Sequence, residues 1–161
     1  MLQQGLHRST VADVAEAAGL GKGTVYLHFD SKQDLADGLR RRYVEQIESE
    51  VRTKVGAAAS APEKLRAAVR SFAVASIRRH DLHHLLFQEA GVDEAQAFAP
   101  IRAVFAEVIN ADDFDLPNRE LAIDYVLGGV HAALIAIAHS PAARRGRATS
   151  QIADLVVRTL T

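Results

Sequence analysis

The stretch GLGKGTVYLHF, residues 19–29, decides between two kinds of protein. Its Gly-Lys-Gly-Thr core is similar to loops that hold nucleotide phosphates, whereas its place between two helical patterns is typical of a helix that enters DNA. A phosphate-binding loop needs G-x-x-x-x-G-K-[ST] after a buried strand. Here Gly23 follows Gly21 and Lys22, and the position five before Gly21 is Glu16. The preceding residues VADVAEAA favour a helix, so we reject the nucleotide loop.

The helix-turn-helix interpretation fits this segment position by position. Ala15 is small where two helices must meet at a steep angle, and Gly19 permits a sharp turn with positive φ. Thr10 is placed to cap the first helix, and Asp13 at the third helical position suits the positive end of the helix dipole. The positions expected to face inward are Val14, Ala18, Leu20 and Val25. From spacing alone, a purely structural helical hairpin remains an alternative.

Length and composition indicate one compact unit or a small module. The 161 residues are 48% hydrophobic, include no cysteine and carry a formal net charge of −1. Disulfides and thiolate zinc sites are therefore excluded, and the charge gives no sign of a broad basic surface. The most apolar run, residues 126–138, is shorter than the roughly 20 residues that a membrane span requires. No leader opens the chain, so we expect a cytoplasmic protein without a membrane partner.

Apolar residues recur at helical spacing throughout, and no stretch alternates as a strand does. The pattern predicts helices over about 32–55, from Pro62 to about 77, and over 82–87, 98–109, 121–138 and 152–160. Loops are predicted at 110–118 and at the basic segment 144–147. We therefore expect an all-α fold, with a helix-turn-helix domain over residues 1–40 and a helical domain over residues 41–161.

The segment STVADVAEAAGLGKGTVYLHFDSKQDL, residues 9–35, resembles the DNA-binding signature of TetR-type (tetracycline-repressor-like) transcriptional regulators. The matching elements are a Thr-opened helix, Gly-x-x-x-Gly-Thr, Tyr-x-His-Phe, and a Lys followed by a helix-starting Asp-Leu. The resemblance implies a homodimeric regulator, most often a repressor, that binds a palindromic operator and releases it when a small organic effector binds. No nucleophile–base pair or acid pair stands at a telling spacing, so we expect neither an enzyme nor a cofactor.

The resemblance assigns DNA contacts to side chains that suit phosphates and base edges. These residues are Thr10, Lys22, Thr24, Tyr26, His28 and Lys32. Gly23 matches the small residue that lets the recognition helix sit close to DNA. Phe29 matches the aromatic residue that packs into the core of the small domain.

The segment before this motif departs from the family pattern. Family members carry an amphipathic helix there, and here only MLQQGLH precedes Arg8. That helix normally covers the apolar faces of Val14, Val25 and Phe29, each of which would otherwise lose about 1.5–3 kcal/mol of burial. We expect either a chain that begins further upstream or a weakened DNA-binding domain. A small-molecule-binding helical protein with impaired or lost DNA binding is therefore the alternative function.

The helix predicted over 32–55 is long enough to join the two domains. Its expected buried stripe is Leu35, Leu39, Tyr43, Ile47 and Val51. We interpret the run of three arginines at 40–42 as a solvated face paired with the glutamates that follow, rather than as DNA contacts. In the resembled family this helix acts as a lever, which effector binding shifts.

Candidate effector contacts lie on the C-terminal helices, with ordinary core packing as the alternative. They are Phe72, Phe87, Phe98, Phe105, Tyr125 and His131. The prevalence of aliphatic residues and the few charges favour an apolar or weakly polar organic molecule.

Three histidines share one helix face at a spacing that metal sites use: His80, His83 and His84. Asp81 and Glu89 are not aligned with them, and Arg78 and Arg79 would repel a cation. We therefore expect a polar helix end and no metal.

The helix that contains Gly128 and Gly129 is apolar on nearly all sides. Glycine within a helix is less favourable than alanine by about 0.5–1 kcal/mol, so a close-packing role is expected. The resemblance implies that this helix and the last one form the dimer interface. A position at the centre of a monomeric bundle is the alternative.

Overall fold

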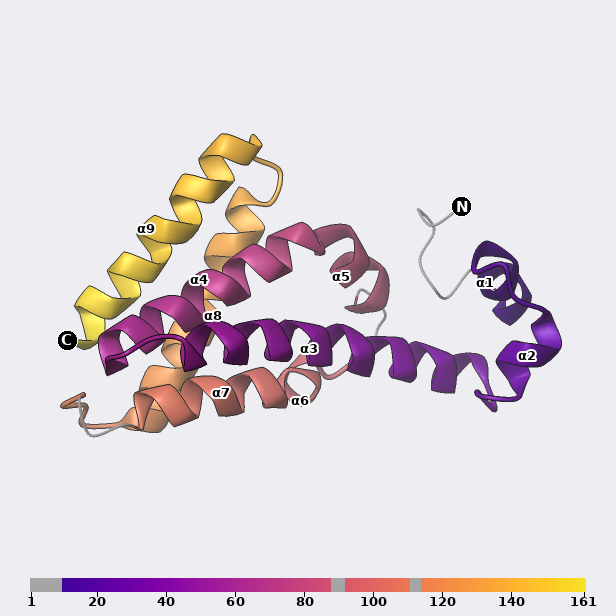
Figure 1. Cartoon of the computed structure of the whole chain (residues 1–161), viewed down its shortest axis with the longest axis horizontal. Coiled ribbons are helices and arrows are strands. Elements are labelled where there is room, and N and C mark those ends of the chain that lie inside the picture. The colour runs from indigo at the N-terminus through magenta and orange to yellow at the C-terminus, as the bar shows by residue number, and fades with distance from the viewer. Residues whose placement is uncertain (1–9, 88–91, 111–113) are drawn as a thin grey trace.

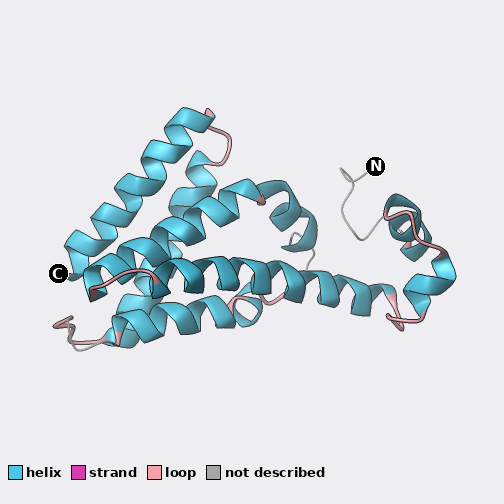
Figure 2. Cartoon of the chain, in the orientation of Figure 1, coloured by secondary structure: helices cyan, strands magenta, loops and turns pink. Residues whose placement is uncertain are grey.

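The computed structural model describes residues 10–87, 92–110 and 114–161. These residues form helices joined by short connections, and none of them lies in a strand (Figures 1 and 2). The all-α prediction is confirmed. The expectation about what precedes the helix-turn-helix concerns residues 1–9, and part of the loop predicted at 110–118 covers residues 111–113. Both segments lie outside the described residues.

Two short helices, α1 (Val11–Ala17) and α2 (Lys22–Tyr26), form the N-terminal unit. Thr10 caps α1 through a reciprocal capping box, in which the Asp13 amide donates to the Thr10 hydroxyl and the Thr10 amide donates to the Asp13 carboxylate. These hydrogen bonds hold the pKa of Asp13 below its usual value. Gly19 turns the chain at φ 68°. Both sequence assignments are therefore confirmed.

The long helix α3 (Lys32–Gly56) begins at Ser31, whose hydroxyl accepts a hydrogen bond from the Asp34 amide. Figure 1 shows α1 and α2 beyond one end of α3, and the other helices gathered along the rest of it. Leu35 packs into a small cluster with Val11, Ala15 and Val25. From Ala36 onward, the buried side chains of α3 belong to the main core. The domain boundary expected at residue 40 therefore falls inside one continuous helix.

The main core is enclosed by α4 (Ala61–Arg78), α5 (His80–Phe87), α6 (Glu94–Ala97), α7 (Ala99–Ile109), α8 (Arg119–Ile137) and α9 (Ala142–Leu160). Helix α4 packs against both α3 and α9, and α7 packs between α3 and α8. Ser60 caps α4 with a second capping box, and Pro62 stands in its first turn. Ion pairs brace neighbouring helices, with Glu50 of α3 meeting both Arg78 and Arg79 at the end of α4.

Two expectations about the helices are corrected, and α6 is a helix that the sequence pattern did not predict. Residues 144–147 are not a loop but lie in the first turns of α9, where the Arg145 guanidinium donates to the Ala138 carbonyl oxygen at the end of α8. Helix α6 is only four residues long, which is too short to produce a periodic pattern. Leu39 is exposed, because the main core contacts α3 through Ala36, Tyr43 and Val44 instead.

Among the described residues, one helix has the length and apolar composition to cross a membrane, and it is α8. The helix is longer than the apolar run 126–138, because α8 begins at Arg119 and its first turns also carry Glu120 and Asp124. A single helix of this kind is weak evidence for a span, since the central helix of a water-soluble bundle passes the same test.

Candidate DNA-binding surface and core cavity

The outer face of α2 and its flanks presents a group of polar side chains. Lys22, Gly23, Thr24, Tyr26 and His28 are exposed, whereas Lys32 is half-buried. Thr10 is also exposed, although its hydroxyl is occupied in the cap of α1. The Lys22 ammonium lies 5.7 Å from the centre of the Tyr26 ring. All seven candidates for DNA contact, which lie between the N-cap of α1 and the first residue of α3, are thus at least partly accessible.

Gly23 of α2 and Gly38 of α3 have different structural roles. A Cβ atom on Gly23 would meet nothing within 4 Å, so the protein itself leaves open space there. A Cβ on Gly38 would lie 2.9 Å from the Phe29 ring. Phe29 packs against the small cluster as expected, and Gly38 of α3 makes room for it. Sequence reasoning missed Gly38, since only the folded chain brings it to Phe29.

The inward-facing prediction for the helix-turn-helix holds in part. Val25 is buried and Val14 is half-buried against the small cluster. Ala18 and Leu20 are exposed, which corrects the prediction. Both follow the end of α1, where the chain turns away from the small cluster formed by α1, α2 and the start of α3.

A cavity of about 200 Å³ lies in the main core among α4, α5, α6 and α8. Its lining is mostly apolar, with Phe72, Ile77, Phe98 and Leu134, and a cluster of histidines completes it. A second space of about 400 Å³ shares Phe72, Phe98, Glu94 and His131 with the first and extends toward α7. A larger groove of about 710 Å³ between α3 and α4 is lined mainly by charged and polar side chains.

The six candidate effector contacts have different locations. Phe72, Phe98 and His131 line both core cavities. Phe87 and Phe105 are buried in the main core and are absent from the cavity walls. Tyr125 is 62% exposed on the outer face of α8 and lines neither cavity, because the side chains of α8 that face inward are Ile123, Val126 and Val130.

His83 is the most strongly perturbed of the cavity histidines. Burial, with smaller contributions from His131, His84 and His80, lowers the pKa of His83 to about 4. Its ring stacks on Phe87 at a centroid distance of 5.0 Å and lies 6.0 Å from the His131 ring. The side chain is therefore a neutral imidazole at pH 7.

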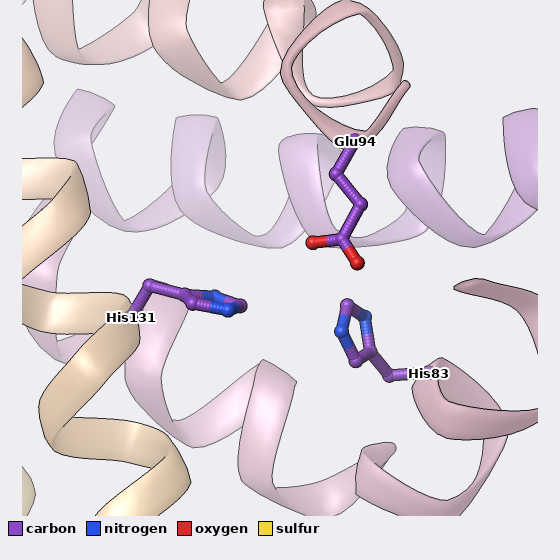
Figure 3. Close-up of side chains that lie close together, drawn as sticks. All are labelled: His83, Glu94 and His131. Atoms are coloured by element: carbon purple, nitrogen blue, oxygen red, sulfur yellow. The ribbon is translucent and has the colours of Figure 1, made fainter. Parts of the chain in front are cut away.

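Figure 3 shows that His83 of α5, Glu94 of α6 and His131 of α8 point toward a common region. Their potential ligand atoms all lie within 4.8 Å of one another. The group with metal-ligand spacing differs from the three histidines considered from the sequence, His80, His83 and His84, because among these only His83 belongs to it. Sequence reasoning missed Glu94 because its partners lie on other helices.

The cavity walls are connected directly to α3. Tyr43 of α3 contacts the rings of His83, Phe87 and Phe98 at centroid distances of 5.9, 5.7 and 6.3 Å. Arg40 of α3, only 5% exposed, donates from Nε to the Leu86 carbonyl oxygen at 2.7 Å and from NH1 to Asp37 at 2.8 Å. Arg40 is thus part of the packing between α3 and α5, which corrects its assignment to a solvated face.

Residues 1–39 match the family model described as "Bacterial regulatory proteins, tetR family". The HTH-type transcriptional activator FasR of Mycolicibacterium smegmatis is 30% identical over 125 residues, which are 76% of this chain and 56% of FasR. The HTH-type transcriptional repressor KstR2 of Mycobacterium tuberculosis is 31% identical over 128 residues, which are 80% of this chain and 60% of KstR2. The chain belongs to the TetR family. The matches to these two curated relatives span less than two thirds of their length.

Solved structures show the same fold over almost the whole chain. The fatty acid degradation regulator FadR from Bacillus halodurans superposes with a TM-score of 0.82 at 18% identity, covering 99% of this chain and 93% of FadR. FadR from Bacillus subtilis, solved in complex with stearoyl-CoA, gives a TM-score of 0.81 at 18% identity with the same coverage. The family and these relatives are transcriptional regulators and not enzymes.

Proposed function

We propose that this TetR-family chain is a ligand-responsive repressor that binds a palindromic operator as a homodimer and releases it when a small organic effector binds. The observation that carries the proposal is the position of α3. Among the described helices, α3 alone contributes buried side chains to both hydrophobic clusters. A displacement of α3 at the cavity therefore moves the unit that bears α2.

The exposed face of α2 supports operator binding. Lys22 and Thr24 suit phosphate contacts, and Tyr26 and His28 suit base edges or phosphates. The empty space beside Gly23 leaves room for a close approach by the DNA backbone. Because α2 has only five residues, one copy reads few bases, and a two-fold dimer on a palindrome doubles the contacts.

The effector is proposed to occupy the cavities between α4 and α8. Ligand pockets are mostly apolar, of about 300–1,000 Å³, with a few polar groups that fix orientation. The space of about 400 Å³ lies within that range, and the cavity of about 200 Å³ lies below it. Both combine phenylalanines with His131 and Glu94. An apolar or weakly polar molecule fits this lining. The relatives support the apolar part of such chemistry, since one FadR structure holds stearoyl-CoA, whose stearoyl chain is a hydrocarbon although its coenzyme A part is charged, and KstR2 is described as a ketosteroid regulator.

The test is selection of DNA sites from a random duplex library, followed by fluorescence anisotropy with the enriched duplex. We expect a palindromic sequence, and we expect Tyr26→Ala or His28→Ala to weaken binding by about tenfold, as loss of one base contact does. Lys22→Ala should also reduce the salt dependence. Lys54→Ala, at an exposed position near the end of α3 away from α2, is the matched control and should bind normally.

Effector release is measured on the same duplex with a panel that includes stearoyl-CoA and a ketosteroid. An effector that weakens wild-type binding supports the proposal. A library that yields no enriched sequence, while a panel member still binds the chain, would instead support the alternative of a small-molecule-binding protein without DNA binding.

A further inference from the structure

We propose that His83, Glu94 and His131 bind one divalent transition-metal ion, with Zn²⁺ as the preferred ion, inside the core cavity. The three side chains come from α5, α6 and α8, and their ligand atoms approach within 4.8 Å of one another (Figure 3). The site goes beyond regulation of DNA binding and stands whether or not the chain binds an operator.

The donor set selects the kind of ion. Two imidazoles and one carboxylate suit zinc and similar ions, whereas magnesium and calcium prefer oxygen ligands throughout. Zinc with three protein ligands keeps a fourth position for water or another small ligand. All three donors also line the 200 Å³ cavity, which has room for that fourth ligand.

The geometry requires a modest closure. Donors in a tetrahedral zinc site are separated by about 3.3–3.5 Å, given bond lengths of about 2.0–2.1 Å. The longest separation here must therefore shorten by roughly 1.5 Å or less. Glu94 lies in the first turn of the one-turn helix α6, and its side chain has several rotatable bonds. A closure of this size requires rotamer changes at Glu94 and His131.

Three arginines near the site are paired with carboxylates, and one of them is Arg102 of α7, which donates hydrogen bonds to Asp124 and Glu120. Arg145 of α9 lines a neighbouring groove with His80 and does not line the cavity of the three donors. Arg78 and Arg79, the nearest basic residues along the chain to His80, pair with Glu50 of α3. Their charges are thus matched by a carboxylate on another helix. Glu94 supplies a negative charge at the cavity itself.

A second observation lies beside the three donors. The Nε2 atom of His80 is buried and has no hydrogen-bond partner within the described part of the chain. His80 lines the same cavity, and its ring contacts His84 at 4.4 Å and His139 at 5.2 Å. His139 is exposed, so a row of imidazoles extends from the surface toward the three donors. Such a row provides a route of entry for an ion that imidazole binds.

The test begins with the full chain, freed of metal by a chelator and dialysed. Titration with ZnCl₂ against a chromophoric competitor should give one ion per chain with a dissociation constant of about 1 μM or tighter. Co²⁺ should give the visible absorption of an imidazole-ligated site. Glu94→Gln keeps the size of the side chain and should weaken Zn²⁺ binding at least tenfold. His131→Gln should do the same.

Glu16→Gln on α1 and Glu45→Gln on α3 are the matched controls for Glu94→Gln, since each removes an exposed carboxylate outside the cavity and outside the row of imidazoles. Thermal unfolding of each metal-free variant establishes whether it is folded. If His131→Gln does not fold, the test rests on Zn²⁺ binding by Glu94→Gln. Binding weaker than about 100 μM in the wild-type chain overturns the proposal. Unchanged binding in Glu94→Gln, or an equal loss in both controls, overturns it as well.

Discussion

Gly19 sets the angle between α1 and α2 through its backbone alone. It is the only described residue with positive φ, at 68°, and a Cβ atom added there would meet nothing within 4 Å. The Leu20 amide that follows donates to the Ala15 carbonyl oxygen at 2.8 Å, which closes the turn. The requirement for glycine is therefore conformational and not steric.

We expect Gly19→Ala to destabilise the helix-turn-helix unit by about 1 kcal/mol, because alanine is strained at positive φ. Hydrogen exchange of the Leu20 amide measures this locally. Gly21→Ala is the control, since Gly21 has φ −68° and its new Cβ would lie at an ordinary 3.7 Å from the Thr24 hydroxyl. Equal acceleration of exchange in both variants would contradict the explanation.

Tyr43 gives the fold a dependence on alkaline pH. Burial, with Arg79 opposing and Glu94 adding to it, raises the pKa of Tyr43 to about 12. The unfolded chain loses this proton near pH 10, so the folded chain holds more protons between pH 10 and 12. The contribution of the protonated Tyr43 hydroxyl to the unfolding free energy is therefore fully present below pH 10, and it is lost as pH rises through 12.

Tyr43→Phe should therefore flatten the decrease in unfolding free energy between pH 10 and 12 by up to about 2 kcal/mol. Urea unfolding at pH 7, 10 and 11.5 measures the effect. Tyr26→Phe is the control, because Tyr26 is exposed on α2. The explanation fails if wild type and Tyr43→Phe lose stability in parallel.

Residue roles that depend on local chemistry could be predicted from the sequence, and others could not. The cap at Thr10 and the turn at Gly19 involve only neighbours within a few positions. The contact of Gly38 with Phe29 and the hydrogen bond from Arg40 to Leu86 exist only because the fold brings distant segments together. No local pattern carries that information.

At the scale of elements, Arg40 joins α3 to the end of α5. The last carbonyl groups of a helix have no partner within it, and a cation is favourable at that end. The Arg40 guanidinium gives the Leu86 carbonyl group both a hydrogen-bond donor and a nearby positive charge. About one turn further along α3, Tyr43 packs against His83. In the proposed mechanism, these two contacts would transmit a displacement of α5 to α3.

Arg40→Met should destabilise the chain by about 1–3 kcal/mol, because it leaves the buried Leu86 carbonyl group without its donor. Arg41→Met, at the next and exposed position, should change stability by less than about 0.5 kcal/mol. The midpoint of urea unfolding distinguishes the two. A similar small change in both variants would show that the contact contributes little.

The helices that could be predicted are the long ones with a clear apolar period. The expected span 32–55 is nearly the whole of α3, and 98–109 contains α7. The start of α9 was misassigned because Arg144, Arg145, Gly146 and Arg147 look like a loop. They form a helix since Pro141 and two alanines begin it and Arg145 ties it to α8. The site residue Glu94 was missed for a related reason, as α6 has no periodic pattern.

At the scale of the whole molecule, the outer face of α8 is apolar, and no other described helix of the same chain covers it. Leu121, Tyr125 and Ile135 are 64%, 62% and 59% exposed, and Leu155 on α9 is 59% exposed. A Cβ on Gly128 or Gly129 would meet nothing within 4 Å, so one chain gives these glycines no packing role. Because the sequence records only that α8 is apolar, it could not separate a central helix from an outer one. The structure places its exposed apolar residues outside the core.

Tyr125→Glu tests whether this face joins two copies of the chain. In a two-fold interface each substitution occurs twice, so two buried charges should weaken the dimer at least tenfold. Sedimentation velocity at micromolar concentration should then show monomers, while the unfolding of the chain itself stays unchanged because Tyr125 makes no core contact. Val74→Glu, on the exposed side of α4, is the control and should remain dimeric. Wild-type protein that sediments as a monomer would remove the dimer from the proposed mechanism, and operator half-sites would then be bound independently.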